Sequence, residues 1–374
     1  MVTPYTWHPG TSRVAGRWPV PIPLAPDELF SMWLVRAALA QGSDPMVLAG
    51  DLWPKWRVWT IDLDRGFCDD RLSSLVRMTG IDAGSFKAAW VLPVALAMGM
   101  EPSGASAIWP WILALGSRNR KRHGGLQYCP ACLASDVHPF YRLQWRLAWH
   151  TCCSVHHVTL YDRCCYCQAP VEPHRLSAFS GMSSCATCNG DMGSGTAAAA
   201  SKGALVFQDC ADYVVRSGAG HYGVNNLTAK EWFFLARYFL MLLRCASRCK
   251  LSGLARCLQM LDPDVALLRP TTTGLGFEML PPGERAVLLS SIGKLILAGP
   301  ARLSSAAASA SLKSASLRQG WRLLPPHIDD IVRALPQVAR SRQPNVRKTV
   351  SEPMPRQTVA YMWARLNRKM RQVS

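Results

Sequence analysis

Apolar residues recur at helical spacing along the chain, and this pattern predicts a mainly α-helical protein. Residues 27–41 are the clearest case, because four apolar side chains fall on one face of a helix: Phe30, Trp33, Leu34 and Ala37. Pro26 and Asp27 suit the start of this helix, and Gly42 suits its end. We therefore expect a buried helix near the N-terminus.

A second apolar cluster predicts two helices joined by a short turn. Apolar positions in residues 72–78 are followed by Thr79 and Gly80, and they resume in residues 81–90. Helix, glycine-containing turn and helix make a helix-turn-helix-like pattern. The pattern suits DNA contact and equally a plain structural helix pair, so both interpretations stay open.

The C-terminal half also has helical spacing. Residues 232–243 carry a broad apolar face, with Arg237 and Arg244 off it. A further helix is predicted over residues 284–297, and Gly299-Pro300 is expected to end it. These stretches predict a helical C-terminal part with a core of its own.

Basic residues outnumber acidic ones, 42 Lys and Arg against 24 Asp and Glu, which leaves a formal net charge of +18. Such a field favours a polyanionic partner. The positive charge is concentrated in a loop at residues 118–123 and in a tail from residue 340. The loop is compatible with phosphate contact and with a solvated charge run, and for the tail we favour nucleic-acid contact. The candidate nucleic-acid-binding residues are Arg118, Arg120, Lys121, Arg122, Arg365, Arg368, Lys369 and Arg371.

No stretch supplies the roughly 20 predominantly apolar residues of a membrane span, and the first residues do not resemble a secretory signal. We expect a cytoplasmic protein that associates with the bacterial nucleoid and not with a membrane. Stable disulfides are rare in that reducing compartment, so paired cysteines indicate metal. Nine of the 14 cysteines lie in residues 129–188. The other five are expected to be ordinary thiols: Cys68, Cys210, Cys245, Cys249 and Cys257.

The cysteine-rich segment contains four ligand pairs, each with two residues between its members. Two such pairs separated by a loop of about 15–20 residues can complete one tetrahedral zinc site. The natural partition puts the first ion on Cys129, Cys132, Cys153 and His156. The second ion then takes Cys164, Cys167, Cys185 and Cys188. The sequence thus predicts two structural Zn²⁺ ions with every coordination position filled by protein.

Neighbouring residues leave the ligand choice partly open. Cys152 adjoins Cys153 and His157 adjoins His156, so the shifted pairs Cys152 with His156 and Cys153 with His157 are possible. We prefer Cys153 and His156 because their spacing matches the other pairs. Three further histidines are less favoured as ligands, since a lone loop histidine seldom binds metal: His138, His150 and His174.

Several motifs of this segment resemble the TniQ family of transposition proteins. The resemblance rests on four runs: Cys129-Pro-Ala-Cys132-Leu133, Tyr141-Arg142-Leu-Gln-Trp145-Arg146, Cys153-x-x-His156, and Leu160-Tyr-Asp-Arg163-Cys164-x-x-Cys167. The helix at residues 27–41 and the helical pair around Gly80 are also similar to that family. Where the family often has Pro after the third and fourth ligand cysteines and Gly after the histidine, this chain has Ser154, Cys165 and His157.

The resemblance implies a non-catalytic adaptor that selects the target site of a transposon. The target would be recognised through the protein's own DNA-binding surface or through a CRISPR effector with its guide RNA. The adaptor would recruit an AAA+ ATPase and, through it, the transposase, and some members of the family are dimers. The alternative from another class is a zinc-dependent regulator that binds a DNA sequence by itself.

An enzyme is disfavoured by the chemistry available. Two-metal phosphoryl transfer needs converging carboxylates, and the acidic pairs here have solvated or helix-capping interpretations: Asp62/Asp64, Asp69/Asp70 and Asp329/Asp330. No GxxxxGK[ST] loop is present. We predict an N-terminal helical domain with the helix-turn-helix-like pair, a double zinc-finger (zinc-knuckle or zinc-ribbon) module, a linker, a C-terminal helical domain and a basic tail, at residues 1–125, 126–190, 191–203, 204–339 and 340–374.

Overall fold

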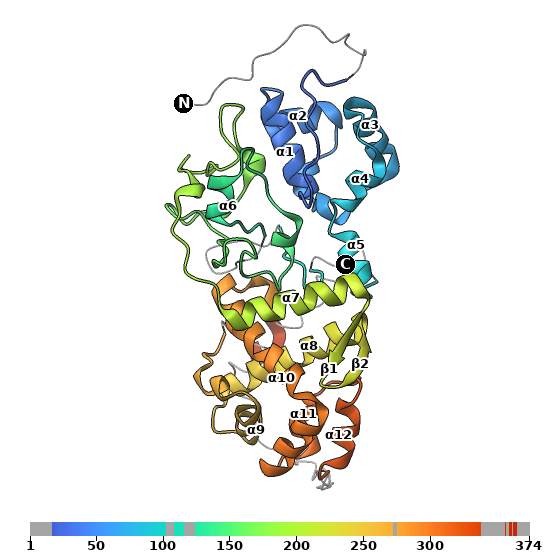
Figure 1. The fold of residues 1–374 in the computed structure, drawn as a ribbon, viewed down its shortest axis with the longest axis vertical. Coiled ribbons are helices and arrows are strands. Elements are labelled where there is room, and N and C mark those ends of the chain that lie inside the picture. The colour runs from blue at the N-terminus through green and yellow to red at the C-terminus, as the bar shows by residue number, and fades with distance from the viewer. Residues whose placement is uncertain are drawn as a thin grey trace. The chain divides into compact units, whose positions relative to one another are not determined.

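The computed structural model of the chain describes residues 17–101, 108–115, 123, 125–271, 275–337, 356, 359, 360 and 362–364. Helices dominate these residues, and a cysteine-rich segment with little regular structure lies between two helical parts (Figure 1). Residues 1–336 form one compact unit, and residues 337–374 form another. The predicted fold class, mainly helical with small cysteine-rich modules in the middle, is confirmed.

The N-terminal part is built around a buried helix. Its elements are α1 Phe30–Ala40, α2 Pro45–Leu52, η1 Val58–Thr60, η2 Leu63–Arg65, α3 Asp69–Thr79, α4 Ala83–Ala88 and α5 Leu92–Ala97. Helix α1 starts later than predicted because Asp27 has a left-handed φ of 57° and Leu29 is still extended. Their backbones bond elsewhere: the Leu29 amide donates to the Tyr141 carbonyl, and the Asp27 carbonyl accepts from Leu143. Gly42 follows the helix with a φ of 71°, as predicted.

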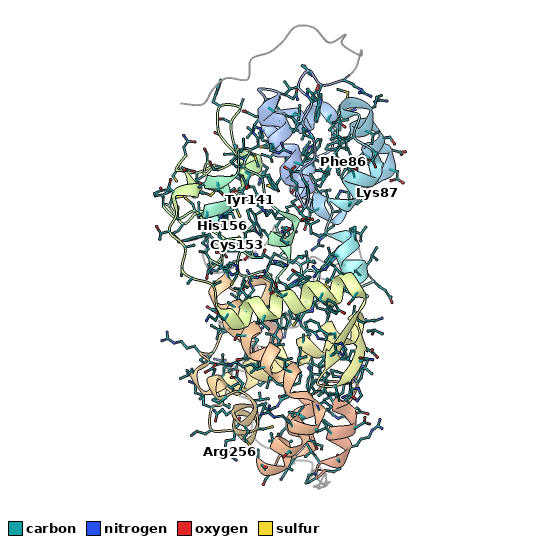
Figure 2. All side chains as sticks on the ribbon, viewed as in Figure 1. Phe86, Lys87, Tyr141, Cys153, His156 and Arg256 are labelled. Atoms are coloured by element: carbon teal, nitrogen blue, oxygen red, sulfur yellow. The ribbon has the colours of Figure 1, made fainter. Side chains whose placement is uncertain are left out.

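Helices α3 and α4 form the predicted helical pair. Gly80 caps α3 with a φ of 77°, a conformation that disfavours residues with a Cβ. Asp82 caps α4 by accepting from the Ser85 amide. Phe86 of α4 packs 4.8 Å from the Trp33 ring of α1, whereas Lys87 is exposed (Figure 2). The aromatic contact ties the helical pair to the core.

The cysteine-rich segment has short elements joined by isolated bridges. They are α6 Pro130–Ser135, η3 Leu143–Arg146, η4 Pro173–Arg175 and η5 Met192–Ser194. The segment predicted as a linker, residues 191–203, pairs with residues 157–159, which directly follow the ligands Cys153 and His156. There the Thr159 amide donates to the Ala198 carbonyl, and the Ala200 amide donates to the His157 carbonyl. This stretch therefore has defined backbone partners.

The C-terminal part packs helices around α8 and α10. Its elements are α7 Lys202–Ser217, β1 Ala219–Tyr222, β2 Asn225–Thr228, α8 Ala229–Arg248, α9 Gly253–Leu261, η6 Pro263–Leu267, η7 Phe277–Met279, α10 Pro282–Ser309, α11 Ser314–Arg318 and α12 Ile328–Ala334. Thr228 and Glu231 form a reciprocal capping box at the start of α8. The antiparallel hairpin β1–β2 was not predicted. Its strands are only four residues long, so they offer too few alternating positions to detect.

Helix α10 contains a break where the sequence predicts its end. Gly299 has non-helical angles, φ 76° and ψ 174°, and a second helical stretch continues from Pro300 to Ser309. By length and composition alone α10 could cross a membrane, although no membrane span was predicted from the sequence. Half of its most apolar window is buried inside the protein, and fully buried Arg285 lies in its first turns. These features fit a kinked core helix.

Candidate metal centres

The first cluster brings together Cys129, Cys132, Cys153 and His156. Their ligand atoms, three Sγ and one His156 Nδ1, all lie within 4.8 Å of one another. Cys132 Sγ is 3.6 Å from Cys153 Sγ and 3.2 Å from His156 Nδ1. Nδ1 is also 3.7 Å from the sulfurs of Cys129 and Cys153. Three of the four residues are buried, and Cys153 and His156 are labelled in Figure 2.

The second cluster brings together Cys164, Cys167, Cys185 and Cys188. Cys164 and Cys188 have sulfurs 3.7 Å apart, as do Cys167 and Cys185. A tetrahedron with Zn–S bonds of about 2.3 Å has edges of about 3.8 Å between its sulfurs. Most of the measured separations in both clusters are close to that edge length, so the donor atoms fit a tetrahedral ion such as Zn²⁺. The structure thus brings together the same eight residues that the spacing singled out.

Three of the four ligand pairs share one backbone turn. In each, the residue after the second ligand has a left-handed φ: His157 at 52°, Gln168 at 57° and Asn189 at 57°. Its amide donates to the carbonyl of the first ligand, as from His157 to Cys153 at 3.0 Å. A further amide donates to the first ligand's sulfur at 3.4 Å in each pair. These bonds aim both ligands of a pair at one point and place positive dipole ends on a thiolate.

The first pair is built differently, on a helix. Cys129 is the N-cap residue of α6, Pro130 occupies its first turn, and Cys132 follows inside the helix. The Leu133 amide donates to the Cys129 carbonyl at 3.1 Å, and the Asp136 amide donates to the Cys132 carbonyl at 3.0 Å. The helical turn therefore does for this pair what the left-handed turn does for the others.

The neighbouring residues left open by the sequence lie outside the clusters. Cys152 is buried with Ala204 and Ala286, where its sulfur is 3.6 Å from the Thr151 hydroxyl. His157 is exposed and belongs to the turn itself. His150 has its Nε2 2.8 Å from an Asp212 oxygen, and the His174 ring stacks 5.3 Å from Trp59. The donor atoms of the first cluster are therefore those of Cys153 and His156.

Hydrogen bonds among the thiols of the first cluster shift their pKa values in opposite directions. Hydrogen bonding with Cys129 and then Cys153 raises the pKa of Cys132. Hydrogen bonds from Cys129 and Cys132 lower the pKa of Cys153 well below its ordinary value. One thiolate is thus stabilised by the protons of its neighbours, and a divalent cation replaces such protons when it binds.

The two clusters are joined through tyrosines. Tyr128, next to Cys129, exchanges two backbone hydrogen bonds with Tyr161, and their rings stack at 5.7 Å. The Tyr128 hydroxyl donates to the carbonyl of Arg163, next to Cys164. Both clusters therefore share one local framework.

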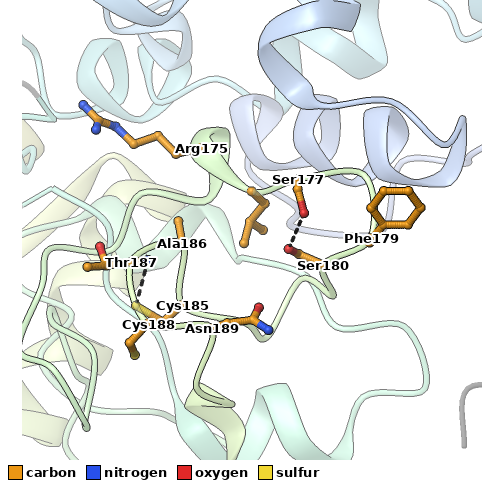
Figure 3. A pocket seen from close by; sticks show the side chains of 10 residues that line it. Arg175, Ser177, Phe179, Ser180, Cys185, Ala186, Thr187, Cys188 and Asn189 are labelled. Carbon is orange, nitrogen blue, oxygen red and sulfur yellow. Dashed lines mark hydrogen bonds between the residues drawn. The ribbon is translucent and has the colours of Figure 1, made fainter.

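The second cluster is the more open of the two. Cys167 and Cys188 are exposed, whereas all three cysteines of the first cluster are buried. A pocket of about 460 Å³ adjoins it, lined by Arg175–Ser177, Phe179–Ser180 and Cys185–Asn189 (Figure 3). Phe179 is fully exposed, at 101%. Solvent and small molecules thus reach Cys167 and Cys188 of this cluster, whereas Cys164 and Cys185 are buried.

Arg146 anchors the first cluster to the N-terminal helices. Its guanidinium is fully buried and donates to Asp62 at 2.7 Å, to Asp64 at 2.6 Å and to the Leu113 carbonyl. Asp64 also accepts from the Ser31 amide and hydroxyl of α1. Burial raises the pKa of Asp64 to about 6, against the opposing charge of Arg146. The solvated or helix-capping interpretation of Asp62 and Asp64 is therefore wrong, because both carboxylates serve a buried arginine.

Two further contacts anchor the cysteine-rich segment to the C-terminal helices. Asp212 of α7 accepts from the Trp149 indole at 2.8 Å and contacts His150. Buried Arg285 of α10 donates to the Gln127 side-chain oxygen at 2.6 Å and to the Ala148 carbonyl. Sequence reasoning missed both anchors. The arginine in an otherwise apolar helix was the only available signal for the second one.

A comparison with protein-family models matches residues 19–160 to TniQ. We refer to this matched range, residues 19–160, as the TniQ region. The resemblance inferred from the sequence motifs is thereby confirmed over this range, and it supports a transposition-associated role. The TniQ region takes in α1 to α5, the Arg146 anchor and the whole first cluster, and it ends before the second cluster begins. No curated protein matches the chain.

The candidate nucleic-acid-binding residues lie outside the described part of the chain. These are Arg118, Arg120, Lys121, Arg122, Arg365, Arg368, Lys369 and Arg371. At the last residue of the basic loop, His123 has its Nδ1 2.6 Å from an oxygen of Asp162, which precedes Arg163. Within the tail, the described residues 356, 359, 360 and 362–364 are helical and exposed. Phosphate contact by the loop and tail stays a prediction.

Proposed function

We propose that this protein is a non-catalytic adaptor that selects target sites for transposition, with two structural Zn²⁺ ions at the clusters. The observation that carries the proposal is the position of the first cluster. Its four donors lie inside the TniQ region at tetrahedral spacing, and Arg146 connects the same segment to Asp64 of η2, which in turn bonds Ser31 of α1. The metal would therefore hold this segment in a defined position against the N-terminal helical part.

A structural role for zinc follows from ligand number. Each cluster offers four protein ligands, which fill a tetrahedral ion and leave no position for a reactive water. When bound, such an ion contributes folding free energy on the order of 10 kcal/mol in small zinc modules. The acidic pair Asp62 and Asp64 is already bound by Arg146. These features support a structural role for the metal ions and not a catalytic one.

The partners proposed are DNA and the transposition machinery. The net charge of +18 supports phosphate contact, with the basic loop and tail as the proposed contact residues. The TniQ region supports recruitment of an AAA+ ATPase and, through it, the transposase. Target recognition would come from the protein's own surface or from a CRISPR effector with guide RNA, in the cytoplasm at the nucleoid. A homodimer is part of the same proposal.

Purification of tagged protein from its native host, with identification of bound proteins and nucleic acid, tests this proposal. We expect an AAA+ ATPase to co-purify, and guide RNA as well if targeting is RNA-directed. A Cys132→Ser variant should lose these partners together with the zinc ion of the first cluster. Metal-dependent nicking of DNA by the purified protein would contradict the non-catalytic role.

A second function is supported by the helical pair α3–α4. A Gly80 turn between two amphipathic helices suits a zinc-dependent regulator that binds a DNA sequence alone. Selection of bound duplexes from a random library by the purified protein separates the two functions. Enrichment of one specific sequence without any partner would favour the regulator. Binding that is independent of sequence would favour the adaptor.

A further inference from the structure

Helix α8 carries three arginines along one side, outside its buried apolar face. Arg237, Arg244 and Arg248 follow at intervals of seven and four residues, which places them on the same face. They line a pocket of about 460 Å³ together with the apolar or weakly polar side chains of Leu240, Met241, Cys245, Leu275, Phe277 and Trp321. The pocket thus joins cationic groups to an apolar wall.

Arg237 already has an anionic partner. Its guanidinium donates to both oxygens of Glu278, at 2.6 and 3.3 Å. Glu278 is 1% exposed and also accepts from the Trp111 amide. The charge of Arg237 is therefore compensated inside the protein.

Arg244 and Arg248 are not compensated in this way. Arg244 donates to the Thr271 hydroxyl at 3.0 Å and to the Leu275 carbonyl at 2.6 Å, and both acceptors are neutral. No carboxylate in the described part of the chain forms an ion pair with Arg244 or Arg248. Burial, and then the charges of Arg248 and Arg237, lower the pKa of Arg244. The pocket consequently has a surplus of positive charge in a partly desolvated position, which favours an anionic ligand.

The apolar wall narrows the class of ligand. Trp321 is held by ring contacts with Phe234 at 5.4 Å and Tyr238 at 5.6 Å, so its face is fixed in place. Pockets of roughly 300–1,000 Å³ suit small molecules and short peptide segments. Duplex DNA presents its phosphates on a convex surface and would leave the apolar wall uncovered. A peptide with a carboxylate beside an apolar side chain satisfies both halves of the pocket.

We propose that this pocket on α8 docks a short acidic segment of a protein partner. A carboxylate would be bound by Arg244 and Arg248, since arginine binds carboxylates through two parallel hydrogen bonds. An adjacent apolar side chain would pack against Trp321 and Met241. The proposal goes beyond the adaptor function and does not depend on it, because the pocket lies outside the TniQ region.

Selection from a phage-displayed library of random twelve-residue peptides tests the docking site. The zinc-loaded full chain serves as bait, and an Arg244→Gln/Arg248→Gln variant removes peptides that bind elsewhere. We expect enrichment of Asp or Glu next to Leu, Ile, Phe or Trp. By fluorescence anisotropy, a selected peptide should bind the wild type at least tenfold more tightly than the double variant.

Two controls make the outcome decisive. Arg302→Gln removes an exposed arginine outside the pocket and should leave peptide affinity unchanged. If the double variant loses its zinc or does not fold, the single variant Arg248→Gln, which changes an exposed residue, is compared with the wild type instead. Its affinity for the peptide should be at least threefold lower. Absence of enrichment, or equal affinity for the variant, would overturn the proposal. Displacement of the peptide by a 20-base-pair duplex with the same dependence on Arg248 would reassign the pocket to nucleic acid.

Discussion

Arg146 and Asp64 form an ion pair in which neither side chain is exposed, with 2.6 Å between the guanidinium Nη1 and the carboxylate Oδ2. The arginine ends the Tyr-Arg-x-x-Trp-Arg motif seven residues before Cys153, and the aspartate lies on η2 beside α1. Because Asp62 and the Leu113 carbonyl share the same guanidinium, one side chain joins three segments far apart in sequence. The pair thus links the segment that carries the first cluster to η2 and, through Ser31, to α1.

Replacing Arg146 by alanine should destabilise the protein by about 3–5 kcal/mol, because the fully buried Asp64 carboxylate would lose its cation. Urea unfolding followed by circular dichroism measures the change. Arg175→Ala is the matched control, since Arg175 makes a salt bridge with Glu172 while 64% of its side chain is exposed. That variant should lose less than about 1 kcal/mol. Similar losses in both variants would mean that the Arg146 anchor contributes little.

Removing one ligand from a cluster should remove one zinc ion. Cys132→Ser and Cys185→Ser are each expected to retain about one zinc per chain where the wild type holds two, with increased proteolysis, because three ligands no longer fill the tetrahedron. Zinc is measured by elemental analysis after gel filtration. Cys152→Ala and Cys165→Ser, which alter cysteines outside the clusters, should keep both ions. A zinc-free wild-type protein would refute both sites.

Substituting His157 by glycine should leave both ions bound and raise stability by about 1 kcal/mol. The residue has a left-handed φ of 52°, which costs a residue with a Cβ roughly 1–2 kcal/mol relative to glycine. His156→Gly should instead lose one zinc ion, because Nδ1 of His156 is the fourth donor of the first cluster. Zinc content and thermal unfolding are compared in the two variants. Loss of zinc from His157→Gly would mean that His157, and not His156, is the fourth ligand of the first cluster.

The second cluster should release its metal before the first. Cys167 and Cys188 are exposed, so a chelator or alkylating reagent reaches them directly, whereas the thiols of the first cluster are covered. Release into a colorimetric zinc chelator should therefore show two phases of equal amplitude. The fast phase should be absent in Cys185→Ser and present in Cys132→Ser. A single phase in the wild type, or loss of the slow phase in Cys185→Ser, would contradict this order.

Local spacing was sufficient to predict much of this protein. Pairs such as Cys164 and Cys167 are brought together by a single turn, so their geometry depends only on adjacent residues. The helical pair around Gly80 could be predicted for the same reason, because periodicity and a left-handed cap are properties of a short window. The TniQ resemblance rests on such local motifs and is confirmed by the family match.

Only the tertiary structure shows which side chains from distant segments of the chain bind one another. Nothing in the sequence near Asp62 and Asp64 indicates that Arg146, more than 80 residues away, binds both carboxylates. Likewise, the sequence placed Arg237 and Arg244 off the apolar face of their helix but did not predict their partners. Arg237 bonds the Glu278 carboxylate, whereas Arg244 bonds neutral acceptors. Spacing favoured Cys153 over Cys152 but left both possible, and the structure places the Cys153 sulfur next to Cys132 and His156. Within a turn, the covalent chain itself fixes the distance between two ligands, so the sequence predicts it. Buried charges are paired by the packing of elements that lie far apart in the sequence, and spacing along the chain does not predict which of them meet.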